Sequence, residues 1–244
     1  MPDQSQIDGI ADGSPSSAAP LDSSANSLAT PLNEDAALAR LAENDLSPEA
    51  IDDISKNAGL MKSRKIRVAM ATHPHTPRRI ALRLVRELYT FDLMQFALAL
   101  TAPADLRHVA DELLIARLAS ITLGERISLA RRCSENVAGA LLLDKEMRVW
   151  QAALESPRLT ESSIVRALQR SVTAAFVESV SHHPKWSLRA EVRLALLRNA
   201  HTPLARALEF ARRLAPAQLR DVLHNSRLPE KIKVYLRKDL ESRK

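Results

Sequence analysis

A short polar motif recurs six times along the chain and constrains its fold more than any other feature. Each copy opens with a side chain that can form hydrogen bonds. It closes with Pro, Ser or Thr four residues later, and these residue types are common where a helix begins. The copies lie at 44–48, 73–77, 156–160, 183–187, 199–203 and 225–229. We call this five-residue pattern the turn motif and expect each copy to separate two helices.

Apolar residues on both sides of the turn motif predict those helices. In most copies, apolar side chains lie seven and three positions before the opening residue, as Ile66 and Met70 lie before His73. This spacing puts both side chains on one face of a helix that ends at the motif. A second apolar run follows, which includes Ile80 and Leu84. One such helix pair cannot bury its apolar stripe alone, so neighbouring pairs must stack.

The fold class follows from this repeat and from composition. Only five glycines occur in 244 residues, and no run of alternating Val, Ile or Tyr indicates a sheet. We therefore predict an all-α fold, an α-solenoid of HEAT-like helix pairs over residues 34–244. The gap of 83 residues from one motif at 73 to the next at 156 has room for two degraded copies, near 101–103 and 133–135. Together these units predict about a dozen helices, with some irregular spacing.

Two copies share a longer pattern that points to a family. The pattern reads Ile66-Arg67-x2-Met70-x2-His73-x2-Thr76-Pro77 in one copy and Val192-Arg193-x2-Leu196-x2-Asn199-x2-Thr202-Pro203 in the other. It resembles the bacterial HEAT-like repeats, and in particular the leucine-rich-repeat-variant type, with an architecture that would cover residues 34–240. Some proteins of that type carry a cysteine cluster for iron and sulfur ahead of the repeats. Cys133 is the only cysteine here, and one thiol cannot hold such a cluster.

The N-terminal residues 1–33 differ from the rest of the chain. They are rich in Ser, Ala, Asp and Pro and have no periodic apolar stripe, so we predict a disordered acidic tail. The segment lacks the basic start and apolar core of a secretory signal, and no run of the chain is apolar for long enough to span a membrane. With a single cysteine there is also no disulfide framework, and the expectation is a soluble cytoplasmic protein.

Charge is distributed unevenly along the chain. Residues 1–59 hold 2 basic and 11 acidic side chains, whereas residues 60–244 hold 33 basic and 18 acidic ones. A body with a net charge of +15 attracts nucleic acid, acidic protein surfaces or anionic membranes. Basic residues share helix faces after four of the turn motifs, and these candidates for a basic groove are Arg79, Arg83, Arg86, Arg166, Arg170, Arg206, Arg213, Lys231 and Lys238. The alternative is that these side chains solvate separate helix faces.

The histidines suggest a metal site only at first sight. His73 and His75 form an H-x-H pattern, and His182 and His183 are adjacent. Zinc needs three or four ligands at about 2 Å, whereas equivalent residues of stacked helices lie about 10 Å apart. Asn or Ser opens the other turn motifs, so we expect the opening residues to bind backbone groups at helix ends, with no metal or cofactor.

Catalytic signatures are also missing, since no nucleophile elbow, phosphate-binding loop or dinucleotide fingerprint occurs. Cys133 is expected to be a small core residue. The chain resembles helical-repeat DNA glycosylases in architecture and basicity, and Trp150, Trp186 and Asp144 are the residues that such an enzyme could use. No motif supports that assignment, and Trp150 is expected to pack in the core.

These observations predict a non-enzymatic binding module that uses a basic groove to bind an acidic protein partner. The first alternative is sequence-independent binding of DNA or RNA by the same groove. With 3% aromatic residues the chain has few stacking platforms for single strands, so any such contact would be to phosphates. A glycosylase is the less favoured alternative.

Overall fold

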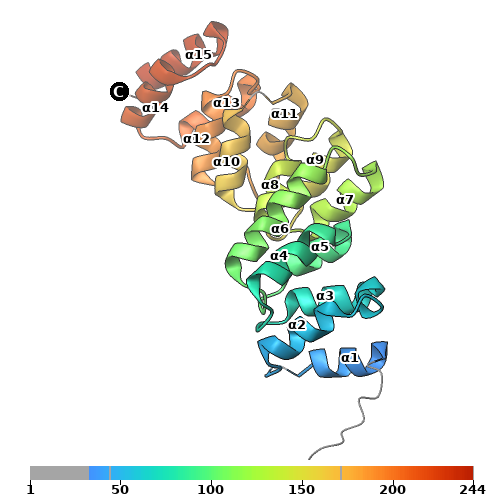
Figure 1. The fold of residues 1–244 in the computed structure, drawn as a ribbon. Coiled ribbons are helices and arrows are strands. Elements are labelled where there is room, and N and C mark those ends of the chain that lie inside the picture. The colour runs from blue at the N-terminus through green and yellow to red at the C-terminus, as the bar shows by residue number, and fades with distance from the viewer. Residues whose placement is uncertain (1–32, 44, 171, 244) are drawn as a thin grey trace, which may run out of the picture. The chain divides into compact units, whose positions relative to one another are not determined.

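A computed structural model describes residues 33–43, 45–170 and 172–243, and all regular structure in these residues is helical (Figure 1). Residues Glu34–Lys244 form one compact unit. The predicted tail lies outside the described residues, apart from Asn33. The all-α prediction is confirmed for the described residues.

The described residues of this unit form fifteen α-helices and one short 3-10 helix, more than the dozen helices expected. They are α1 (Glu34–Leu41), α2 (Pro48–Lys56), η1 (Leu60–Lys62), α3 (Arg64–Thr72), α4 (Arg78–Glu87), α5 (Thr90–Leu98), α6 (Ala104–Arg117), α7 (Leu123–Arg132), α8 (Glu135–Leu141), α9 (Met147–Leu154), α10 (Glu161–Gln169), α11 (Ala174–His182), α12 (Ala190–Arg198), α13 (Leu204–Arg212), α14 (Pro216–Asn225) and α15 (Glu230–Glu241).

The helices pack in chain order. Each closely packed pair consists of helices that are one or two positions apart along the chain (Figure 1). One series of contacts runs from α4 to α6, α8, α10, α12 and α14, each helix touching the next. We call these six helices the even row. Among the described residues, this series links neighbouring helix pairs from α4 to α14.

The opening residue of the turn motif ends a helix and reaches back to an earlier one. His73 caps α3, where its Nδ1 accepts a hydrogen bond from the backbone N–H two residues on (3.2 Å) and its Nε2 lies 2.9 Å from the carbonyl oxygen of Glu43. Asn199 caps α12 in the same way. Its Oδ1 accepts from the N–H two residues on (3.0 Å), and its Nδ2 donates to the carbonyl of Leu168 (2.9 Å). The expected role at helix ends is confirmed at both positions.

His183 completes this group, but two other copies depart from it. The His183 ring accepts from the N–H of Lys185 and contacts a Glu155 carboxylate oxygen at 3.2 Å. Asn225 still belongs to α14 and donates to the carboxylate of Asp221 one turn back, so the capping prediction is wrong there. It is also wrong for Ser156, whose buried hydroxyl has no hydrogen-bond partner among the described residues. Asn44 lies outside the described residues.

Further side chains reach back between units. Trp186 donates its indole N–H to the carbonyl of Leu154 (2.9 Å), and Arg117 donates to the carbonyl of Leu88 (2.6 Å). Arg206 donates through Nε to the carbonyl of Ser181 (2.8 Å). In each case the donor follows the acceptor by 25 to 32 residues. Carbonyls at helix ends, which lack partners within their own helix, are thus satisfied by the next unit.

The long gap between motifs contains both degraded turns where they were expected. Ala99 and Pro103 bound the turn between α5 and α6, and Cys133 and Ser134 separate α7 from α8. Ser134, the N-cap of α8, also donates to the buried carboxylate of Asp111 on α6 (2.6 Å). This hydrogen bond joins α6 and α8, two neighbouring helices of the even row.

Candidate binding surface

The nine predicted groove residues do not lie on one row of helices. Arg79, Arg83 and Arg86 on α4, and Arg166 and Arg170 at α10, belong to the even row. The remaining four lie on or directly after α13 and α15, which pack on each other and outside that row: Arg206, Arg213, Lys231 and Lys238.

The reason is the short spacing between two turn motifs. α12 follows the motif at 183–187 and precedes the motif at 199–203, so it is the second helix of one unit and the first of the next. The helices after later motifs are therefore odd-numbered. The nine groove candidates are therefore divided between two series of packed helices.

Several of the nine side chains are already engaged. Arg79 pairs with Asp52 (2.7 Å), and the pKa of that carboxyl is lowered by hydrogen bonds from Lys56 and Arg79. Arg206 pairs with Glu209 and lies over the ring of Phe210. Of the nine, the exposed side chains without a hydrogen bond or ion pair to any described residue are Arg83, Arg86, Arg170, Lys231 and Lys238.

A hollow of about 360 Å³ opens on the even row between α6, α8 and α10. Small residues make the space: Gly139 and Ala140 on α8 and Ala167 on α10. A Cβ added at Gly139 would meet Ser163 at 3.4 Å, an ordinary contact, so alanine would fit there. The complete lining is His108, Ile115, Asn136, Gly139, Ala140, Leu143, Ser163, Arg166, Ala167 and Arg170. We call it the central hollow.

The lining of the central hollow has an apolar part, Ile115, Gly139, Ala140, Leu143 and Ala167, which we call the floor, and a basic part, Arg166 and Arg170. Ile115 and Leu143 are large apolar side chains left 38% and 36% exposed. Arg166 is held by the Ser163 hydroxyl (3.0 Å) and lies 3.9 Å from Glu135. Arg170, one turn further on, has no side-chain partner among the described residues. This arrangement can bind a partner that places an aliphatic side chain on the floor and a carboxylate at Arg170.

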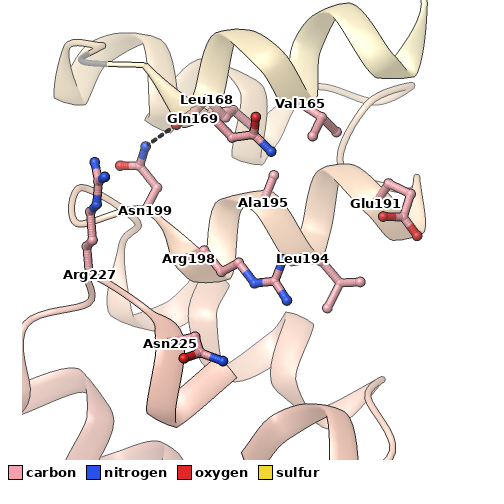
Figure 2. A pocket seen from close by; sticks show the side chains of 10 residues that line it. All are labelled: Val165, Leu168, Gln169, Glu191, Leu194, Ala195, Arg198, Asn199, Asn225 and Arg227. Atoms are coloured by element: carbon pink, nitrogen blue, oxygen red, sulfur yellow. Dashed lines mark hydrogen bonds between the residues drawn. The ribbon is translucent and has the colours of Figure 1, made fainter. Parts of the chain in front are cut away.

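A second hollow of about 280 Å³ adjoins α10 on its other side, between α10, α12 and the turn after α14 (Figure 2). Asn199 lies in its wall and points to the carbonyl of Leu168, as the dashed line in Figure 2 shows. Arg198 at this hollow pairs with Asp221 (2.8 Å), and hydrogen bonds from Arg198 and Asn225 lower the pKa of the Asp221 carboxyl. Arg227 is exposed beside it.

The residues considered for chemistry make contacts within the fold. Trp150 packs edge-on against Phe176 at 5.4 Å between ring centroids, which confirms the packing expectation. Asp144 accepts two hydrogen bonds from Arg126 (2.8 and 2.9 Å). Cys133 is fully buried, as expected of a core residue, and burial raises the pKa of its thiol to about 12.

The described residues also contain no group of three or more His, Cys, Asp or Glu side chains placed to hold a metal ion. Within the same part of the chain, none of the helices has the length and apolar character needed to cross a bilayer.

Comparison of the chain with protein-family models, curated proteins and solved structures gives no match. What the surface can bind therefore follows from its own residues. Sequence patterns identified Arg166 and Arg170 but missed the floor of the central hollow. The only signal for that floor was the run of small residues around Gly139, which carries no turn motif.

Proposed function

We propose that the chain is a non-enzymatic, cytoplasmic binding module, an α-solenoid of HEAT-like helix pairs that holds an acidic protein partner on its even row. Packing between helices one or two positions apart supports the solenoid. The observation that carries the function is the central hollow, in which an apolar floor lies beside Arg166 and Arg170.

A protein segment uses both parts of this surface. One aliphatic side chain buried on the floor gains about 25 cal/mol for each Å² of apolar area removed from water. A carboxylate at the free guanidinium of Arg170 forms a charge-assisted hydrogen bond. Duplex nucleic acid, the alternative partner, is bound through its phosphates, and Ile115 and Leu143 contribute nothing to phosphate contacts. The division of the nine basic residues between two sets of helices also favours a protein partner over a continuous duplex track.

The test compares three fluorescein-labelled probes by anisotropy. These are a peptide with Leu flanked by Glu, the same peptide with Lys in place of Glu, and duplex DNA. We expect the acidic peptide alone to bind tightly at physiological salt. The double variant Arg166→Glu/Arg170→Glu, and separately Ala140→Leu to fill the floor, should each weaken it by about tenfold or more.

The matched control is Arg131→Glu/Arg132→Glu on α7, which makes the same charge change at two exposed residues away from the hollow. An equal loss in this control would mean that the peptide senses net charge and not the hollow. If DNA binds more tightly than the acidic peptide and Ala140→Leu leaves the affinity for DNA unchanged, the nucleic-acid alternative replaces the proposal.

A further inference from the structure

Helix α15 carries apolar side chains on two different faces. Ile232, Leu236 and Leu240 face inward and pack in a cluster with residues of α13 and α14. On the other side, Lys231, Val234, Tyr235 and Lys238 are all exposed at positions i, i+3, i+4 and i+7, the spacing of one helix face. We call these four residues the α15 face.

The apolar centre of the α15 face stands out among the exposed residues. Val234 is 54% exposed and Tyr235 is 53% exposed. Among the residues that the structure describes, they are the only large apolar side chains exposed at consecutive positions. Lys231 and Lys238 flank them and form no ion pair with any described residue. An exposed apolar pair rimmed by charge is typical of a protein interaction surface.

Helix α1 of the same chain presents the complementary pattern. Asp35, Ala39 and Glu43 are exposed at positions i, i+4 and i+8, and we call them the α1 face. Glu43 follows the helix by two residues, but its N–H still bonds to the carbonyl of Arg40 (3.0 Å), so the turn continues. The carboxylates bracket a small residue, just as the two lysines of the α15 face bracket Val234 and Tyr235.

Spacing and charge match between the two faces. Seven positions separate the lysines and eight separate the carboxylates, or about 10.5 and 12 Å along a helix. Arg40 is the one base on α1, yet residues 34–56 hold 7 acidic and 2 basic side chains. The α15 face cannot pair with its own copy as well, because antiparallel pairing of two such helices brings Lys231 of each beside Lys238 of the other.

We propose that copies of this chain associate head to tail, with the α15 face of one copy packed on the α1 face of the next. Val234 and Tyr235 lie over Ala39, and the lysines pair with Asp35 and Glu43. Because the contact joins an α15 face to an α1 face, each complex keeps one free α15 face and one free α1 face. Further copies of the chain can therefore add at both ends. The contact is small and its ion pairs are screened by salt, so association is concentration-dependent and weakens as salt rises.

Sedimentation velocity of the full chain over a range of concentrations tests this directly. We expect the weight-average sedimentation coefficient to rise with concentration at low salt and to fall back in high salt. Lys231→Glu/Lys238→Glu, which destroys the α15 face, and Ala39→Trp, which blocks the α1 face, should each give monomers. Circular dichroism and melting temperature check that both variants fold.

Mixing the two variants gives the decisive result. Each keeps the face that the other has lost, so an equimolar mixture should form heterodimers and stop there. A single chain that combines Lys231→Glu/Lys238→Glu with Asp35→Lys/Glu43→Lys should associate again, since the charges are exchanged. The proposal is overturned if the full chain is monomeric at low salt, or if the mixture of the two variants stays monomeric. It is also overturned if the Ala39→Trp variant associates with itself, because the contact would then not use the α1 face.

Discussion

His73 and Asn199 show how two different side chains can do the same structural work. In each, one atom accepts from the backbone N–H two residues on, and a second donates to a carbonyl of the preceding unit. For His73 this fixes the proton on Nε2, because Nδ1 accepts. The sequence indicated this equivalence, because both His and Asn occur at the opening position of the turn motif. The sequence did not show that Asn225 leaves the capping role, where its amide donates to the carboxylate of Asp221 one turn back.

This equivalence predicts the outcome of substitution at His73. His73→Ala should lower the free energy of unfolding by about 2 kcal/mol, because it removes two hydrogen bonds of the buried His73 ring, one from the N–H of His75 and one to the carbonyl of Glu43, each worth about 1 kcal/mol. His73→Asn should cost less than half as much, since its amide can form both hydrogen bonds. Urea denaturation followed by circular dichroism measures both values. Equal losses in the two variants would show that the ring acts through packing alone.

At the scale of helices, the sequence predicts those that the turn motif marks and misses others. α3 and α4 were predicted because His73 and Pro77 mark the break between them. The breaks after α4 and α8 contain no proline, and the chain turns there at Leu88 and at Leu142. Neither break carries the turn motif on which the sequence prediction depended. The part of the central hollow's floor that lies on α8 was missed for the same reason.

Helix α7 gives a prediction on pH. Glu125 closes a capping box with Thr122, and hydrogen bonds from the Thr122 backbone N–H and hydroxyl lower the pKa of the carboxyl. A lowered pKa in the folded state stabilises the fold above the unfolded pKa of about 4.3, and the contribution is lost as pH falls through the folded value. Glu125→Gln keeps an acceptor for Thr122 but does not titrate. Its melting temperature should therefore fall less than that of the unaltered chain between pH 5 and pH 3. The same fall in both proteins would contradict this account.

At the scale of the whole compact unit, Glu34–Lys244, the described helices pack closely on their neighbours along the chain. Helices pack closely only with those one or two positions away, so a change in one unit has few routes to a distant one. Charge and repeat spacing alone suggested a single groove. The sequence contains the spacing of 16 residues between the motifs at 183 and 199, but only the structure shows that α12 is shared and that the basic helices then change rows.

A substitution at Leu236 tests whether a change in one group of helices leaves the stability of distant helices unaltered. This side chain is fully buried in the cluster of α13, α14 and α15, and Leu236→Ala should cost about 2–5 kcal/mol locally. Native-state hydrogen exchange should then speed up at amides of α13–α15, while those of α3–α6 keep their protection. Uniformly faster exchange would mean that the unit unfolds as a single cooperative body.

The direction of the contacts between units has a consequence for synthesis. Where Trp186, Asn199 and Arg206 cross from one unit to another, the donor belongs to the part of the chain that leaves the ribosome later. A nascent unit thus emerges with these helix-end carbonyls bonded to water, and they gain their protein donors only when the next unit follows. Maturation proceeds from the N-terminus, and a stalled ribosome would expose the most recent, incomplete unit, the species that chaperones must hold.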